Sequence, residues 1–478
     1  SAQVPGSLLY TPARKRHPKP AGTCVPIRVH LRLHMLSTCM SHLLFHVLRL
    51  CCAFIVARGA ASLASAIPTN QSEGLLLLQL GAGKALHADA EASTRHRPHV
   101  LFILVDDLGY SNVGFTRSGG IQSQDVKTPE IDQLAARGVV LNRMYVHYMC
   151  SPTRSAIQSG RAPIHVNVVN TALVAHNPSD ADGGFAGIPR NMTGLAELMR
   201  RGGYRTHYVG KWDAGMATPD HTPAGRGYDT SLNYFTHEND YWTFKGVFDC
   251  GHGELTDFWE MNATTPYPGR PPYHLLNSKE CSDSNQLGGK CVYEDKLFLD
   301  RVIATISDHN KSVPMFLFWA PHIAHGPLQV PSQHHAKFSF MQDAAHLSAI
   351  QASTSWSFQD TIETTMALRQ TYSSMVNWLD DAVGKVVRAL EAKAMYWNTL
   401  IILSSDNGGP VGPYAGASNY PLKAGKYSNF EGGVRVAAFI SGGFVPEAVR
   451  GTRQDNIITA WDWYATLAGL AGGSFFHP

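Results

Sequence analysis

The sequence predicts an α/β fold in which helices cover both faces of a mostly parallel sheet. Residues 100–105 form a continuous apolar run, which is typical of a strand buried on both faces. Similar short runs follow at residues 206–209, 315–319, 399–403 and 436–440. Ahead of the run at 399–403, apolar residues recur at helical spacing from Leu368 to Leu390. Strands that alternate with helices favour a parallel sheet covered on both sides.

Composition bounds the class of protein. The chain has 478 residues, of which 44% are hydrophobic and 16% charged, so it is long enough for two or three domains with a sizeable core. This composition excludes a generally disordered chain or a coiled coil. Residues 1–100 carry 11 Lys and Arg against 3 Asp and Glu, whereas the remainder carries 29 against 34. The body is therefore mildly acidic, and we expect no nucleic-acid partner.

The N-terminal segment is expected to precede the folded body. Residues 1–39 form a leader that we assign to no fold. Residues 40–66 resemble a signal peptide, with an apolar run followed by Ala64-Ser65-Ala66, although His46 and Arg49 interrupt the run. A buried helix is the alternative, and the run is too short for a transmembrane anchor. Residues 67–97 have the composition of a linker. We therefore expect the secretory pathway, with the mature protein secreted or in a lysosome-like compartment.

Cysteines and glycosylation motifs are compatible with that route. Four of the eight cysteines lie within residues 1–66, and three others, Cys250, Cys281 and Cys291, share a loop-rich stretch. A local Cys281–Cys291 disulfide is plausible, but three cysteines cannot all pair among themselves. Acceptor motifs for N-glycosylation begin at Asn70, Asn191, Asn262 and Asn310.

Acidic and amide side chains follow two of the expected strands. Asp106 and Asp107 come directly after the first, and Asp406 and Asn407 follow the run at 399–403. Functional groups in open α/β sheets gather beyond the carboxyl ends of the strands. Three carboxylates and an amide form a hard oxygen-ligand set, suited to Ca²⁺ or Mg²⁺. Either pair alone is better explained as a helix or turn cap, but the two together favour a metal.

A short motif adds a reactive group to this set. Cys150-Ser151-Pro152-Thr153-Arg154 is followed by Ser159-Gly160-Arg161, and this resembles the sulfatase signature C-x-P-x-R. Three flanking motifs fit in the family's order, namely Val209-Gly210-Lys211-Trp212, His325-Gly326-Pro327-Leu328, and Lys426 ahead of Glu431-Gly432-Gly433-Val434-Arg435. On these residues the chain resembles the sulfatase family over residues 98–478. It looks most like the arylsulfatase B-like branch through Asn233-Tyr234-Phe235 and the run from His325 to Pro331.

The resemblance implies a fold and a domain arrangement. The fold is the alkaline-phosphatase-like α/β sandwich, with residues 98–478 as the catalytic domain. Family members usually continue into a small C-terminal α+β domain, and we expect this domain to be missing from the printed sequence.

The resemblance also implies a site. Cys150 would be oxidised to formylglycine by the formylglycine-generating enzyme, and its hydrate would attack the sulfur of a sulfate monoester. Asp106, Asp107, Asp406 and Asn407, with modified Cys150, would bind Ca²⁺, Mg²⁺ being the alternative. The sulfate would be neutralised by three cations, Arg154, Lys211 and Lys426. His325 would contact the ester oxygen and protonate the leaving alcohol, with Lys426 as the other candidate donor and His322 as a substitute for His325. The expected substrate is a sulfated carbohydrate or an aryl sulfate.

One position departs from the family pattern. The family's Gly-Lys-Trp-His reads Gly210-Lys211-Trp212-Asp213 here. Three explanations remain open: Asp213 is itself the base, another histidine such as His207 fills the gap, or the protein binds substrate and turns it over poorly. Two rival functions follow from the same residues, a phosphonate or phosphate monoester hydrolase and a non-catalytic protein that binds sulfated glycans.

Overall fold

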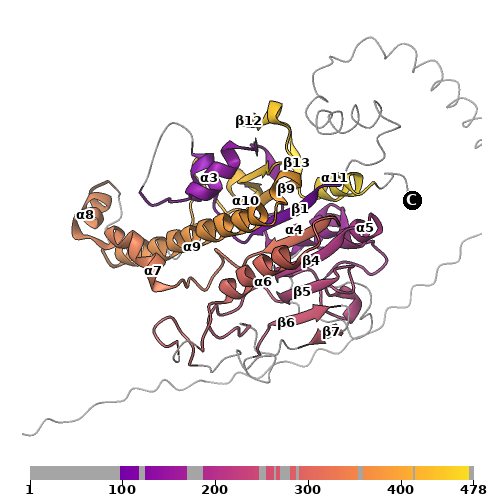
Figure 1. Cartoon of the computed structure of the whole chain (residues 1–478). Helices are drawn as coiled ribbons and strands as arrows, with labels where there is room; N and C mark the ends of the chain where they lie inside the picture. The colour runs from indigo at the N-terminus through magenta and orange to yellow at the C-terminus, as the bar shows by residue number, and fades with distance from the viewer. Residues whose placement is uncertain are drawn as a thin grey trace, which may run out of the picture. The chain divides into compact units, whose positions relative to one another are not determined.

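The computed structural model describes most of the chain after residue 96 (Figure 1). The described residues are 97–117, 124–168, 187–246, 255–262, 265–269, 280–286, 290–353, 359–412 and 415–472. The chain divides into two units, Ser1–Ser72 and Glu73–Pro478, and all described residues belong to the second. Outside the described residues lie the expected leader, the signal peptide, the linker as far as residue 96, Asn70 and Cys250.

A ten-stranded sheet organises the protein, and its central five strands are parallel. Their order is β9 (Thr399–Ser405), β1 (His99–Val105), β8 (Met315–Ala320), β4 (Arg205–Lys211) and β5 (Thr230–Tyr234). These strands include four of the five expected apolar runs, and the predicted α/β class is confirmed. β1 lies between two neighbours in this parallel core, which explains why every one of its residues is buried.

The flanking strands complete the sheet in mixed directions. β11 (Ala438–Ser441) is antiparallel to β9, and it is followed outward by β2 (Val139–Leu141) and β12 (Thr452–Gln454). On the other side, β6 (Trp259–Asn262) and β7 (Thr265–Gly269) are antiparallel additions to β5.

The expectation of one strand at 436–440 was wrong. β10 (Arg435–Val436) belongs to a separate three-stranded sheet with β3 (Met144–Tyr145) and β13 (Ile458–Thr459), and β11 begins at Ala438. An apolar run predicts burial, but it carries no information about which sheet a residue joins or in which direction the strand runs.

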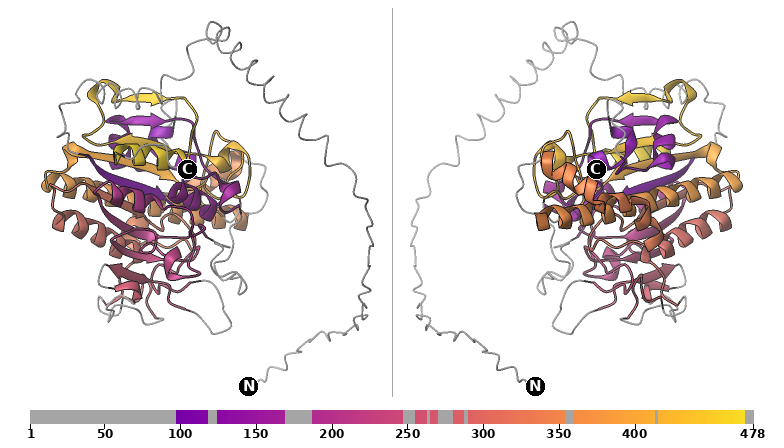
Figure 2. Two further views of the ribbon diagram at one scale, coloured as in Figure 1. Left: turned by 90° about the vertical axis from the view of Figure 1, so that its right-hand side faces the viewer. Right: turned by 90° about the vertical axis from the view of Figure 1, so that its left-hand side faces the viewer.

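Alternate residues of β1 face two separate cores. Leu101, Ile103 and Val105 pack in the core that includes α3 (Pro129–Ala136), α6 (Glu294–Asp308) and α9 (Gln359–Ala392). The remaining apolar residues of the strand pack in the core that includes α4 (Cys150–Ser159), α5 (Leu195–Arg201) and α11 (Asp462–Leu470). Figure 2 shows helices on both sides of the central strands. The amphipathic segment 368–390 lies within α9, as its spacing predicts.

The other helices are short. They are α7 (Ser332–His335), α8 (Ala344–Ser353), α10 (Glu431–Val434) and the 3₁₀ helices η1 (Tyr110–Asn112), η2 (Gly114–Thr116), η3 (Pro163–His165), η4 (Pro219–His221), η6 (Ala336–Gln342), η7 (Tyr396–Asn398) and η8 (Glu447–Val449). Within the described part of the chain, no helix has the length and apolar character that crossing a membrane requires.

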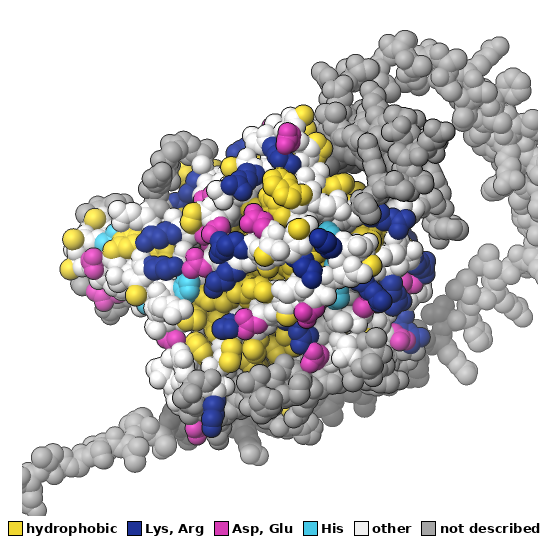
Figure 3. All heavy atoms as spheres, viewed as in Figure 1, with side chains coloured by type: hydrophobic (Ala, Val, Ile, Leu, Met, Phe, Trp, Pro, Cys, Tyr) yellow, Lys and Arg dark blue, Asp and Glu magenta, His cyan; other side chains and the backbone are white. Residues whose placement is uncertain are grey.

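The face that carries α6 and α9 mixes charges of both signs. Figure 3 shows Lys and Arg side chains interspersed with Asp and Glu, with hydrophobic side chains exposed around α6. Leu297 and Ile303 of α6 are among the partly buried residues that pack against the core beneath this helix.

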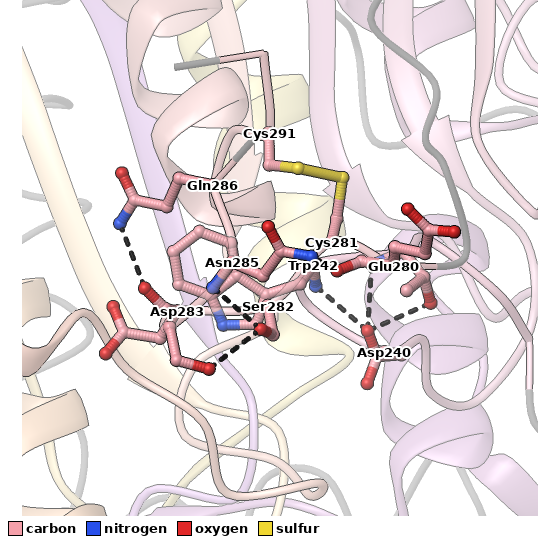
Figure 4. The surroundings of a disulfide bond; sticks show 11 residues. Asp240, Trp242, Glu280, Cys281, Ser282, Asp283, Asn285, Gln286 and Cys291 are labelled. Atoms are coloured by element: carbon pink, nitrogen blue, oxygen red, sulfur yellow. Dashed lines mark hydrogen bonds between the residues drawn. A yellow bond between two sulfur atoms is a disulfide. The ribbon is translucent and has the colours of Figure 1, made fainter. Parts of the chain in front are cut away.

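A disulfide joins Cys281 and Cys291, whose Cα atoms are 5.6 Å apart (Figure 4). Both cysteines are buried and belong to the core that includes α6 and α9. Figure 4 places the bridge beside Trp242 and Asp240, and the Asp240 carboxylate accepts backbone N–H groups of the turn that follows it. The expected local pairing is confirmed, and it closes a loop of sequence separation 10 against the core.

Removing this bridge should destabilise the protein without changing its fold. A disulfide that closes a loop of this length lowers the entropy of the unfolded chain, which raises the free energy of unfolding by about 3 kcal/mol at 25 °C. The double variant Cys281→Ala/Cys291→Ala should therefore unfold at lower urea concentration, with far-ultraviolet circular dichroism in buffer unchanged. Equal urea midpoints for the variant and the unreduced parent would contradict a stabilising role.

Candidate active site

The functional side chains converge at the carboxyl end of the central strands. β1 and β9 pair in register as far as Val105 and Ser405, so the segments after the two strands leave the sheet side by side. The backbone N–H of Asp107 donates to Asp406 Oδ1 at 3.2 Å, and Asn407 Nδ2 donates to Asp107 Oδ1 at 2.6 Å. In-register parallel pairing thus places two acidic segments 300 residues apart in one cluster.

Cys150 is the first residue of α4 and faces this cluster. Its Sγ lies 3.6 Å from Asp106 Oδ1, and its side chain is fully buried. Burial, followed by the negative charge of Asp406, raises the pKa of the Cys150 thiol well above its ordinary value. Because the thiolate is the nucleophilic form of cysteine, the unmodified side chain is poorly suited to attack. Cys150 therefore lies where a nucleophile is needed, but its unmodified thiol is a poor one.

Three buried cations each pair with a different carboxylate of the cluster. The pairs are Lys211 with Asp106, Lys426 with Asp107, and Arg154 with Asp406, at N–O distances of 2.6, 2.8 and 2.8 Å. Arg154 also donates from Nη1 to the carbonyl oxygen of Lys211 at 2.9 Å, which holds Arg154 and Lys211 together. Buried charges are tolerated only when they are paired and hydrogen-bonded, so removing one member would leave another uncompensated.

Burial and neighbouring charges shift the pKa values of Asp107 and Asp406 in opposite directions. Burial by itself would raise the pKa of Asp107, but Lys426 and His325 outweigh it and hold the pKa below its ordinary value. Burial, followed by the negative charge of Asp106, raises the pKa of Asp406. Lys426 keeps its charge, because the attraction of Asp107 outweighs burial and raises the pKa of the ammonium.

Close backbone packing positions Lys211. Gly210 precedes it at the end of β4 with φ of 111°, a conformation that L side chains rarely adopt. A Cβ atom there would lie 1.8 Å from the carbonyl oxygen of Ala320 in β8. The glycine therefore lets β4 approach β8 where Lys211 turns toward Asp106.

Four donor groups lie close enough together to hold a metal ion. One ligand atom from each of Asp106, Asp107, Cys150 and His325 lies within 4.8 Å of the others. Asn407 Oδ1 is buried and has no hydrogen-bond partner among the described residues, so an amide oxygen is available beside the carboxylates. Carboxylate and amide oxygens are the ligands that Ca²⁺ and Mg²⁺ prefer.

The two expected histidines play different parts. His325 Nε2 lies 3.7 Å from Asp107 Oδ2, at the edge of the cluster. His322 is fully buried, and its Nδ1 lies 2.9 Å from Glu294 Oε2. Because His322 is committed to a buried acid of α6, it is a poor substitute for His325.

His207 does not fill the gap left at position 213, and that alternative is wrong. Its Nδ1 bonds to Thr230 Oγ1 at 2.7 Å, and its ring contacts that of His309. His207 lies four residues before Lys211 on β4, toward the opposite end of the strand.

A different histidine meets Asp213. His237 Nδ1 lies 2.9 Å from Asp213 Oδ1, and the same oxygen accepts the Ser151 hydroxyl at 2.8 Å. Asp213 Oδ2 lies 3.8 Å from Lys211 Nζ. Burial by itself would raise the pKa of Asp213, but His237, followed by Lys211, holds it below its ordinary value.

Sequence reasoning missed His237 and its neighbour Glu238. Both lie in the loop after β5, and Glu238 Oε2 lies 3.4 Å from His325 Nδ1. No motif marks this loop. The signal that could have found it is the departure at Asp213, since a buried carboxylate needs a partner.

Comparison with known proteins agrees with this architecture. A family model described as Sulfatase matches residues 98–474. The chain belongs to the sulfatase family, and its fold is the alkaline-phosphatase-like α/β sandwich.

Individual relatives are similar at moderate identity. Arylsulfatase J of Mus musculus is 30% identical over 385 residues, which cover 80% of this chain and 54% of that protein. N-acetylgalactosamine-6-sulfatase of Mus musculus is 27% identical over 404 residues, covering 83% of this chain and 66% of that protein. The crystal structure of Ps i-CgsB in complex with k-i-k-neocarrahexaose aligns with a TM-score of 0.60 at 28% identity, covering 80% of this chain and 73% of that one. The chain thus spans from about half to two thirds of the length of these curated relatives.

The buried acids behind the site should make stability depend on pH. Burial raises the pKa of Asp295 to about 8, and its Oδ1 accepts the backbone N–H of His322. Because the folded-state pKa of Asp295 lies above its unfolded value of about 3.9, the folded protein binds the proton more tightly than the unfolded chain does. The resulting stabilisation is fully present below about pH 3.9 and is lost as the pH rises toward about 8. Asp295→Asn keeps an acceptor without the charge, so it should gain stability relative to the parent as the pH rises.

Urea unfolding of both proteins at pH 5 and pH 8 measures this difference. The variant's advantage should be larger at pH 8, and it can grow by at most about 1.4 kcal/mol per pH unit. An advantage that is equal at the two pH values would contradict a protonated Asp295 in the folded protein.

Proposed function

We propose that this protein is a sulfuric ester hydrolase that acts on sulfate monoesters of sulfated carbohydrates or aryl alcohols. The observation that carries the proposal is the convergence of Cys150 with three buried cations on one cluster of carboxylates at the end of the sheet. Sulfated substrates are the chemistry named for two relatives, arylsulfatase J and N-acetylgalactosamine-6-sulfatase.

We further propose that Cys150 is converted to formylglycine by the formylglycine-generating enzyme and that Ca²⁺ binds beside it. Formylglycine supplies a hydrated aldehyde as nucleophile, and the cation lowers the pKa of that nucleophile and draws charge from the sulfate. Asp106, Asp107, Asp406 and Asn407 would hold the cation, as their oxygen-rich donor set and the unpartnered Asn407 Oδ1 support. Mg²⁺ is the alternative ion.

The chain's own residues account for binding and orientation. Arg154, Lys211 and Lys426 remain charged and buried, so they present preorganised positive charge to a sulfate group. His325 lies at the edge of the cluster next to Asp107, where it would contact the ester oxygen and give a proton to the leaving alcohol. Because these side chains are largely buried, the site excludes bulk water around the developing charge.

The proposed location is the secretory pathway, in a secreted or lysosome-like compartment. The Cys281–Cys291 disulfide supports it, because disulfides persist in oxidising compartments. Asn191 and Asn310, which begin two glycosylation motifs, are exposed.

Activity toward paired aryl esters tests the reaction class. The full chain, made in a eukaryotic secretory host, should hydrolyse an aryl sulfate, and Cys150→Ala should abolish this activity. Lys426→Ala should lower kcat by about 10²–10³-fold, the range seen when a preorganised electrostatic contact is removed. Lys296→Ala, at an exposed lysine of α6, is the matched control and should leave kcat unchanged.

Two outcomes would redirect the proposal. Faster turnover of the matching aryl phosphate would indicate the phosphate or phosphonate hydrolase. Binding of sulfated sugar without any release of sulfate would indicate the non-catalytic protein.

Calcium binding has a thermodynamic test that needs no turnover. A ligand at a hundredfold excess over its Kd stabilises the folded state by about 2.7 kcal/mol. Adding Ca²⁺ should therefore raise Tm, and Asn407→Ala should reduce this rise by removing an oxygen donor. Asn456→Ala, at an exposed asparagine, is the control and should keep the full rise. An unchanged Tm in wild-type protein over millimolar Ca²⁺ would contradict the assigned ligands.

A further inference from the structure

The carboxylate of Asp213 is held at the base of the candidate site by contacts from three directions. Its Oδ1 accepts the hydroxyl of Ser151, the neighbour of Cys150 on α4, at 2.8 Å. The same oxygen lies 2.9 Å from His237 Nδ1. Oδ2 lies 3.8 Å from Lys211 Nζ. The side chain of Asp213 is fully buried, so water screens its charge little and its electrostatic interaction with these groups is strong.

The backbone at this position is also unusual. Asp213 has φ of 46°, in the left-handed region, where Asp is tolerated better than most L residues. Trp212, just before it, is fully buried, and its indole nitrogen donates to the carbonyl oxygens of Gly215 and His221 at 2.8 and 3.1 Å. The buried Trp212 and the left-handed backbone of Asp213 together fix where the Asp213 carboxylate lies.

His237 comes from a different part of the chain. It lies in the loop after β5, and its side chain is 11% exposed. The next residue, Glu238, lies 3.4 Å from His325, so this loop contacts the site at two places. The loop is anchored by Asp257, whose carboxylate accepts the backbone N–H groups of Phe235 and Thr236.

Charge balance shows what the pair supplies. An isolated carboxylate at position 213 would add negative charge beside the anionic sulfate ester, which disfavours attack. A carboxylate beside a histidine base instead orients the imidazole and stabilises the imidazolium that forms once the base has accepted a proton. The pair also keeps an imidazole that can take up and release a proton, which a carboxylate of low pKa does poorly near pH 7.

We propose that Asp213 and His237 together replace the single histidine of the family pattern. His237 accepts the proton that leaves the hydroxyl on residue 150 when sulfate is released, and Asp213 orients His237 and balances its charge. In that step the O–H bond breaks, its electron pair forms the aldehyde C=O bond, and the C–O bond to sulfate breaks with its pair on sulfate. The proton passes to His237 and then to solvent. This inference rests on the proposed function.

The central test compares variants at position 237. His237→Gln keeps a side-chain donor for Asp213 and cannot carry a proton, so kcat for an aryl sulfate should fall at least tenfold. KM should fall with it, because slower release lets the covalent intermediate accumulate, and kcat/KM should change less than twofold. His207→Gln replaces a histidine away from the site and should leave both constants unchanged. A fall in kcat/KM that matches the fall in kcat, or no fall in kcat at all, would overturn the assignment to the release step.

A second variant separates chemistry from folding. Asp213→His/His237→Gln restores the family's single histidine and removes the second one. It should recover at least tenfold in kcat over His237→Gln, which a merely structural role for His237 would not allow. Failure of this rescue in a protein whose Tm equals that of the parent would count against the pair.

Mass spectrometry of peptide 144–154 adds a readout other than turnover. After a brief reaction with aryl sulfate and an acid quench, the peptide from His237→Gln should retain covalent sulfate, whereas the parent peptide should retain little. Absence of retained sulfate in a slow variant would overturn a role in release.

If the parent itself neither hydrolyses aryl sulfate nor has a modified residue 150, the proposed function fails and this inference with it. If the parent works and the variants match it, only the inference fails.

Discussion

The in-register pairing of β1 with β9 is the constraint on which the rest of the site depends. It delivers Asp106-Asp107 and Asp406-Asn407 to one point at the end of the sheet, where the carboxylates are out of contact with water. Buried carboxylates repel one another and are costly unless they are compensated. The positions of the three cations follow from this requirement, since each supplies one short ion pair to the cluster. In the proposed reaction, the cations that stabilise these acids would also hold the anionic sulfate ester.

The departure at position 213 is absorbed by the surrounding structure. A carboxylate that would be a liability beside an anionic substrate is paired with His237 and anchored by Ser151. Asp213 and His237 lie 24 residues apart on different loops, and the role of each depends on its contact with the other. Family membership and an intact cation set are compatible with a working enzyme in which two side chains do what one does in the usual pattern.

Much of this arrangement could be predicted from the sequence, and the reasons differ by element. The buried strand 100–105 and the helix from 368 to 390 were readable because period and apolarity follow directly from burial. The gathering of Asp106 and Asp406 was readable because parallel strands end at one edge. The break at Ala437 and the antiparallel direction of β11 were not, since an apolar run reports burial only. His237 was unreadable because a loop without a motif acquires its neighbour only through tertiary folding.

The proposed chemistry requires a formylglycine at residue 150, inside this cluster of charges. The most direct measurement is the mass of the peptide 144–154 from the full chain made in a eukaryotic secretory host. The expected mass corresponds to formylglycine in place of Cys150 in most of the molecules. An unmodified cysteine at this position, in a host whose own sulfatases are fully converted, would contradict the account and leave a protein that binds sulfated ligands without hydrolysing them.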